Sequence, residues 1–160
     1  MSTKARTTFA NRFLISKLRY GMPLYIGETQ AIKHKLHIQI MTIARFCRGN
    51  YGFKVSCHKI CKSLKWDVPE QTLLKSAALY IHKCTFYGKP KQINNLLRTT
   101  RMRRNNNIYI KYMYETGKFE RNMLIQACKL YNSLPEDLKS LLPKLFKTRI
   151  KKLYIEGHKD

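Results

Sequence analysis

The chain has 160 residues, which is enough for one domain with an apolar core or for two small domains. It carries 32 Lys and Arg against 9 Asp and Glu, a formal net charge of +23, and 44% of its residues are hydrophobic. This hydrophobic fraction argues against a disordered tail, and the charge favours contact with a polyanion. No apolar run approaches the roughly 20 residues that cross a bilayer, and the first residues lack a signal-peptide core. We therefore expect an intracellular protein, nuclear or cytoplasmic, without a membrane span.

The first half of the chain predicts helices. Residues 4–20 form a basic helical pattern with Phe9, Phe13, Leu14 and Leu18 near one side. Thr29 can cap a helix to about Arg48, since apolar residues there recur every three or four positions. Those residues are Ile32, Leu36, Ile40, Ile43 and Cys47. Ser56 starts a short helix, and Asp67-Val-Pro-Glu70 has the form of a capping box opening a helix to about Tyr87.

Residues 98–121 differ from what precedes them. Four arginines precede an asparagine run, and the following Ile108–Tyr114 is rich in β-branched and aromatic residues, which is typical of a strand. We predict a strand or hairpin near residues 106–116, with a partly ordered loop as the alternative.

The C-terminal part is again helical in pattern. Ser133-Leu-Pro-Glu136 has the form of a second capping box, and Pro143 marks a bend or a new start. The last helix, to about Ile155, has one apolar face, made of Leu142, Leu145, Phe146, Ile150, Leu153 and Tyr154. We predict a mainly α protein: a bundle of about six helices with one short strand or hairpin.

Catalytic and metal signals are sparse. The three aspartates are Asp67, Asp137 and Asp160; the first two lie at helix starts, and no aspartate pair or phosphate-binding glycine loop occurs. We therefore expect no enzymatic activity of the chain's own and no cofactor. Cys57, Cys61, His82 and Cys84 are weak zinc candidates, because the i, i+4 spacing of the first two also suits buried core cysteines.

The basic surfaces are the remaining candidate site. No acidic residue occurs between Glu28 and Asp67, or between Glu70 and Glu115. Arginine suits phosphate, and tyrosine can stack on unpaired bases. An anionic membrane surface and an acidic protein partner are the alternatives to nucleic acid. The residues that we expect to bind nucleic acid are Arg98, Arg101, Arg103, Arg104, Tyr109, Lys111, Tyr112, Lys144, Lys147, Lys151 and Lys152.

Five segments, in order, resemble the region downstream of the polymerase core in non-LTR (jockey-like, LINE-type) retrotransposon reverse transcriptases. In this chain they read Lys17-Leu-Arg-Tyr-Gly-Met-Pro-Leu-Tyr25, Ile43-Ala-Arg-Phe-Cys-Arg-Gly49, Leu64-Lys-Trp-Asp-Val-Pro-Glu-Gln71, Lys129-Leu-Tyr-Asn-Ser-Leu-Pro-Glu-Asp-Leu-Lys139 and Phe146-Lys-Thr-Arg-Ile-Lys-Lys-Leu153. Tyr25 and Tyr131 stand where the family usually has Trp, and Lys65 where it usually has Gly.

The resemblance implies a thumb-like basic helical region at residues 1–97, a basic Asn-rich segment at 98–121 and a C-terminal helical region at 122–160, together one composite domain. It implies that the chain grips template–primer or element RNA. The expected partners are RNA or an RNA–DNA hybrid, duplex DNA, and the polymerase palm. The palm aspartates and the endonuclease are not in this sequence, so polymerase activity is not carried over. A degenerate remnant that acts as a structural or protein-interaction module is the alternative.

Overall fold

The computed structural model describes residues 2–49, 55–101, 106–110 and 121–156, and it is mainly helical, as predicted. The N-terminal part is one long helix with an internal π-helical stretch, a 3-10 segment and a second long helix. These elements are α1 (Thr3–Phe9), η1 (Ala10–Ile15), α2 (Ser16–Gly21), η2 (Met22–Gly27) and α3 (Gln30–Arg48).

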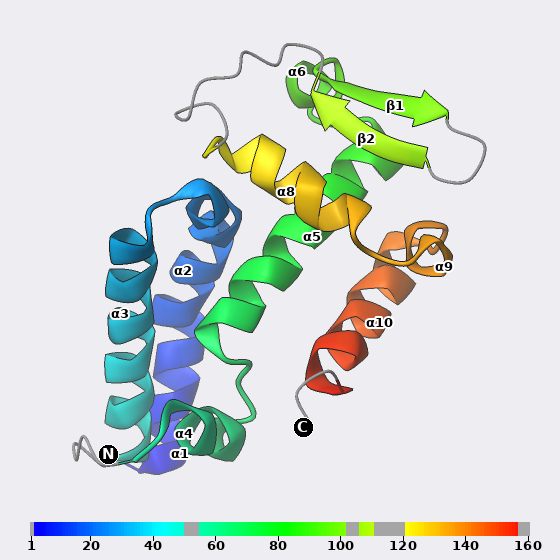
Figure 1. The fold of residues 1–160 in the computed structure, drawn as a ribbon. Helices are drawn as coiled ribbons and strands as arrows, with labels where there is room; N and C mark the ends of the chain where they lie inside the picture. Colours follow the sequence, from blue (N-terminus) through cyan, green and yellow to red (C-terminus); the bar gives the residue numbers. More distant parts are fainter. Residues whose placement is uncertain (1, 50–54, 102–105, 111–120, 157–160) are drawn as a thin grey trace.

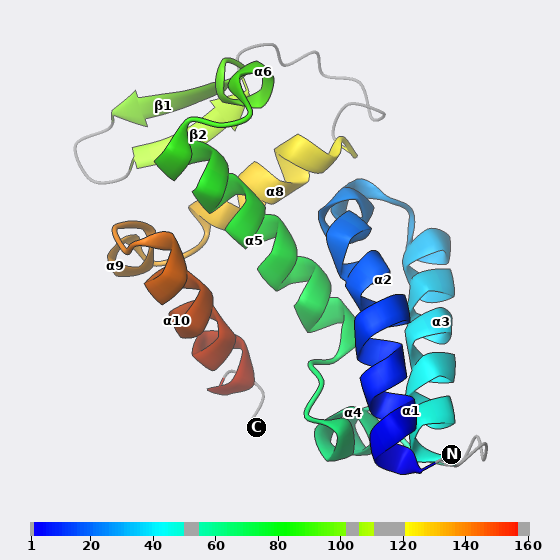
Figure 2. The same ribbon diagram turned by 180° about the vertical axis from the view of Figure 1, so that it is seen from behind.

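The rest of the chain is organised around one long central helix. Its elements are α4 (Cys57–Leu64), α5 (Pro69–Tyr87), α6 (Lys91–Asn94), β1 (Leu97–Arg101), β2 (Asn106–Ile110), α8 (Met123–Asn132), α9 (Glu136–Lys139) and α10 (Pro143–Glu156). Helix α5 contacts η2, α3, α8 and α10. The α1–α3 helices lie on one side of α5 and α10 lies on the other, while α8 crosses α5 beneath the strands (Figures 1 and 2).

The two strands pair antiparallel, from Leu97 opposite Ile110 to Arg101 opposite Asn106. The predicted strand therefore forms at 106–110 and pairs with residues that come just before the asparagine run. Residues 111–116 of that prediction lie outside the described residues.

The residues at several helix starts and ends adopt the conformations and hydrogen bonds expected from the sequence. Gly49 and Gly88 follow α3 and α5 in the left-handed conformation, with φ of 69° and 61°, where glycine has no steric penalty. Ser56 accepts a hydrogen bond from the Lys59 backbone N–H at the start of α4. These features depend only on neighbouring residues, so the sequence predicts them well.

Both predicted capping boxes are wrong. Helix α5 begins at Pro69, and Asp67 instead pairs with Lys75 across the helix start, 3.1 Å from its Nζ. The Ser133 hydroxyl donates to the Leu130 carbonyl at the end of α8, and Glu136 pairs with Lys139 at 2.9 Å. In each case the side chain has a partner that is better placed than the backbone N–H three residues on.

The predicted apolar faces of the first and last helices are only partly buried. In α10, Phe146 and Ile150 are buried, but Leu142 and Leu145 are 58% and 54% exposed. In the first helix, Ala10 and Ile15 are buried, whereas Phe9, Phe13 and Leu14 face solvent. The π-helical winding of η1 changes the helix phase, so the 3.6-residue period does not carry across it.

His82 is the most enclosed polar side chain at the centre of the fold. Its ring stacks on Phe146 with centroids 4.0 Å apart. Its Nδ1 lies 3.0 Å from the Tyr131 hydroxyl and its Nε2 lies 2.9 Å from the Leu141 carbonyl oxygen. The carbonyl can only accept, so Nε2 carries the proton and Nδ1 accepts from Tyr131. His82 thus joins α5, α8 and the start of α10.

Burial lowers the pKa of His82 below its ordinary value, despite the opposing effect of its bond to Leu141. The unfolded chain therefore takes up a proton at higher pH than the folded chain. We expect the contribution of His82 to stability to be complete above about pH 6.5 and to fall as the pH drops toward the lowered pKa. Urea unfolding of the wild type and His82→Gln across this range checks it: the variant should lose much of the pH dependence, and an unchanged dependence would contradict the assignment.

Candidate nucleic-acid interface

The strand pair positions the first group of predicted binding residues. Arg98 is exposed on β1 and sits opposite Tyr109 in the register, while Arg101 sits opposite Asn106. Leu97 and Ile110, the next pair, are both buried. The alternation along β1 therefore anchors the strand through Leu97 and leaves Arg98 in solvent. The remaining predicted residues of this group, Arg103, Arg104, Lys111 and Tyr112, lie outside the described residues.

Asn132 holds the strand pair on the helices, a role that sequence spacing did not indicate. Its side-chain oxygen accepts from the Ile108 N–H at 2.9 Å, and its side-chain nitrogen donates to the Ile108 carbonyl at 2.8 Å. The amide thus pairs with the free edge of β2 as a neighbouring strand would. Asn132 belongs to the Tyr131-Asn-Ser-Leu-Pro135 segment, so the resemblance marked the position without indicating this contact.

Helix α10 carries the second group. Lys144, Lys147 and Lys151 are exposed, and their three- and four-residue spacing sets them in one row about 10 Å long. Lys152 is also exposed, farther round the helix. Phe146 and Ile150 fix the opposite side of α10 in the core, so the row faces outward. In Figure 1 the strands lie above α8 and α10 lies below it, with α9 beyond the C-terminal end of α8.

The acidic residues that the structure describes make no ion pair with Arg98 or with the α10 row. In the C-terminal helices of the described chain, Glu136 already pairs with Lys139, which also donates to the Asn132 carbonyl. Asp137 lies on α9 with no ion pair to a lysine of the α10 row. Among the described side chains, Arg98 and the lysines of the α10 row therefore stay available to an external anion.

The four zinc candidates are not brought together. Cys57 and Cys61 lie on α4, where the Cys57 thiol contacts the Met41 sulfur at 3.1 Å, and burial raises the pKa of Cys61 to about 12. Both nitrogens of His82 are already hydrogen-bonded, and Cys84 lies in the central core. Within the described ranges, no three side chains that bind metals form a cluster.

No protein-family model, no curated protein and no solved structure matches this chain. Among the helices that the structure describes, none combines the length and the apolar character needed to cross a bilayer.

Proposed function

We propose that this chain binds nucleic acid through its exposed basic side chains, as the C-terminal part of a non-LTR reverse transcriptase that grips template–primer or element RNA. The grip is electrostatic and includes no chemical step. Arg98 on β1 and the lysine row of α10 are the described side chains proposed to contact phosphates, and Arg101 remains a candidate from the sequence.

One observation carries the proposal: the chain has far more cations than its own acids can neutralise. Even if all 9 acidic residues were paired, 23 of the 32 Lys and Arg would have no acidic partner. Such an excess opposes folding through self-repulsion and is relieved when a polyanion binds. Nucleic acid supplies a regular array of charges that a row of lysines can follow.

The reverse transcriptase part of the proposal rests on the five sequence segments and on one backbone conformation. Lys65 ends α4 with φ of 56°, in the left-handed region that most residues avoid. This is the position where the family usually has glycine, which adopts that conformation without a steric penalty. The left-handed conformation of this chain at position 65 is therefore the one that a glycine of the family pattern would favour.

Replacing Lys65 by glycine should stabilise the protein by about 1 kcal/mol, because it removes the cost of a left-handed side chain. Thermal unfolding of Lys65→Gly beside Lys62→Gly measures it. The control places glycine inside α4 and should destabilise by a similar amount. If Lys65→Gly is less stable than the wild type, residue 65 does not have the left-handed conformation, and this support for the family is lost.

Binding across a salt series tests the function. Fluorescence anisotropy with an RNA–DNA hybrid, single-stranded RNA and duplex DNA should show affinities that fall by about 10³–10⁵ between roughly 50 and 200 mM salt, if six to ten phosphates are neutralised. Preference for the hybrid or the RNA would support the reverse transcriptase assignment. A flat salt response would refute the proposal.

A second candidate function is a protein-interaction module, and the exposed leucines of α10 favour it. Leu142 and Leu145 continue the predicted apolar face but have no cover in the described chain. On this alternative they pack against the missing polymerase palm or another partner. The isolated chain should then self-associate at high concentration, and Leu142→Ser with Leu145→Ser should abolish that association in light scattering.

A further inference from the structure

The first helix presents an exposed pair of aromatic rings that plays no part in the core. Phe9 and Phe13 are 44% and 57% exposed, and their ring centroids lie 5.2 Å apart at an angle of 36°. Ala10 and Ile15 supply the buried contacts of the same helix. Neither phenylalanine belongs to the buried core, and each leaves much of its ring free to contact a ligand.

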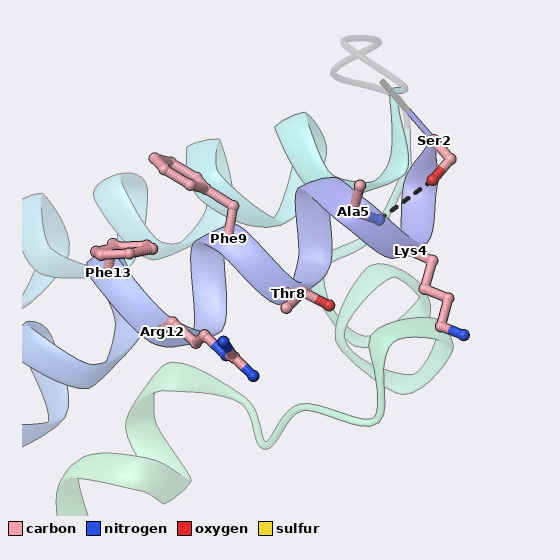
Figure 3. A pocket seen from close by; sticks show the side chains of 7 residues that line it. All are labelled: Ser2, Lys4, Ala5, Thr8, Phe9, Arg12 and Phe13. Atoms are coloured by element: carbon pink, nitrogen blue, oxygen red, sulfur yellow. Dashed lines mark hydrogen bonds between the residues drawn. The ribbon is translucent and has the colours of Figure 1, made fainter.

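Two cations belong to the same surface as the rings. Figure 3 shows Phe9 and Phe13 on one flank of the helix and Lys4, Thr8 and Arg12 along the other. These side chains line a surface hollow of about 480 Å³. The surroundings are strongly basic as well: residues 1–48 contain nine Lys and Arg and one acid, Glu28.

Phe13 also lines a second hollow. Phe13 and Leu14 face Ile38 and Ile43 of α3 across an apolar groove of about 580 Å³, with Lys17 at its edge. A ligand that stacks on Phe13 can thus continue into this groove. The aromatic strip and the groove form one surface, bordered by cations.

The charge and the ring geometry indicate which kind of ligand fits the Phe9–Phe13 surface. A second copy of the chain would bring another +23 to the same surface, so self-association there is opposed. Single-stranded nucleic acid combines apolar base faces with a phosphate backbone, and aromatic rings beside cations are how proteins hold it. A base between the two rings would need one stacking distance of about 3.4 Å on each side. The ring centroids are only 5.2 Å apart, so bases must stack on the outer faces of the rings.

We propose that the first helix is a second binding site, specific for single-stranded nucleic acid, in which Phe9 and Phe13 stack on unpaired bases and Lys4 and Arg12 contact the adjoining phosphates. The inference rests on the proposed function and adds to it. Helix α10 lies on the opposite side of α5 from this helix, and the strand pair lies at the C-terminal end of α5, away from α1 near its N-terminal end (Figures 1 and 2). The chain would hold unpaired strand at one end of the molecule and duplex or hybrid at the other.

The test compares a thymidine oligonucleotide with a DNA duplex of equal phosphate number. Phe9→Ala with Phe13→Ala should weaken oligonucleotide binding on the order of a hundredfold, about tenfold per lost stacking contact, and leave duplex binding unchanged. The salt slope should stay the same, since no charge is removed. Lys4→Ala with Arg12→Ala should instead reduce the single-strand slope by about 1.4.

Two further variants separate stacking from a general apolar effect. Phe9→Tyr with Phe13→Tyr keeps both rings and should bind like the wild type, whereas Phe9→Leu with Phe13→Leu should bind like the alanine variant. Leu24→Ala is the matched control, since Leu24 is 61% exposed but lies outside the strip. All variants should keep the wild-type melting temperature, because the rings are outside the core.

Wild-type oligonucleotide affinity in the Phe→Ala variant would overturn this inference, while salt-dependent duplex binding would leave the proposed function standing. Wild-type oligonucleotide affinity in the Phe→Leu variant would also overturn the inference, because aromatic stacking would then not be needed. An acidic amphipathic helix of a protein partner would in that case suit the Phe9–Phe13 surface better than bases. Failure of the wild type to bind any nucleic acid would remove both proposals together.

Discussion

Replacing Lys144, Lys147 and Lys151 by alanine should weaken duplex or hybrid binding by a few hundredfold at about 0.1 M salt. These lysines form one exposed row on α10, held outward by the buried Phe146 and Ile150. Each phosphate neutralised contributes about 0.9 to the slope of log affinity against log salt concentration. At about 0.1 M salt, three such contacts therefore raise the affinity by a factor of roughly 10²–10³ over its value at 1 M salt, where charges are screened. The slope of log affinity against log salt should fall by about 2.7.

A control with the same charge change shows whether the row matters or only the total charge. Lys83, Lys89 and Lys91 are exposed near the end of α5 and on α6, and their replacement by alanine removes three charges elsewhere. This control should lose much less affinity than the α10 variant. Equal losses would mean that the net charge acts as a diffuse attraction and that α10 is no binding site.

Replacing Gly27 by alanine should cost about 3 kcal/mol and lower the melting temperature by roughly 6–12 °C. A Cβ at this position would overlap the Arg121 carbonyl oxygen and lie 2.8 Å from the Met123 nitrogen. Both atoms belong to the backbone, so the end of η2 and the start of α8 would have to separate. That contact closes the central core, since η2 packs on both α5 and α8.

Gly21 is the matched control. A Cβ there would meet nothing closer than the Tyr25 ring at 3.9 Å, an ordinary contact, and Gly21 lies in α2. Gly21→Ala should leave stability unchanged or raise it by up to about 1 kcal/mol, because alanine loses less conformational entropy in a helix. Equal unfolding temperatures for the two variants would show that η2 and α8 do not approach as closely as the structure has them.

The sequence motifs that suggested a family contribute residues both to the core and to a proposed binding surface. Met22, Tyr131 and Leu134 are buried, and Trp66 packs against the central core and against a smaller group of buried residues on α3 and α4. The last motif, Phe146–Leu153, carries Lys147 and Lys151 of the α10 row. The helical architecture was predictable from the apolar periodicity, whereas the contact of Asn132 and the exposure of the Phe9–Phe13 pair follow only from the structure.

The sequence by itself determined the helical class, the ends of α3 and α5 at Gly49 and Gly88, and the excess of positive charge, because these depend on composition and on residues a few positions apart. Only the tertiary structure decided which apolar faces are covered. Periodicity marks an apolar side of a helix, but burial requires a second element that arrives from elsewhere in the chain. The fold supplies one for Phe146 through α5, whereas Leu145 and Phe13 stay more than half exposed. The same reason explains the partners of Asp67 and Asn132, whose contacts were set by packing and not by spacing alone.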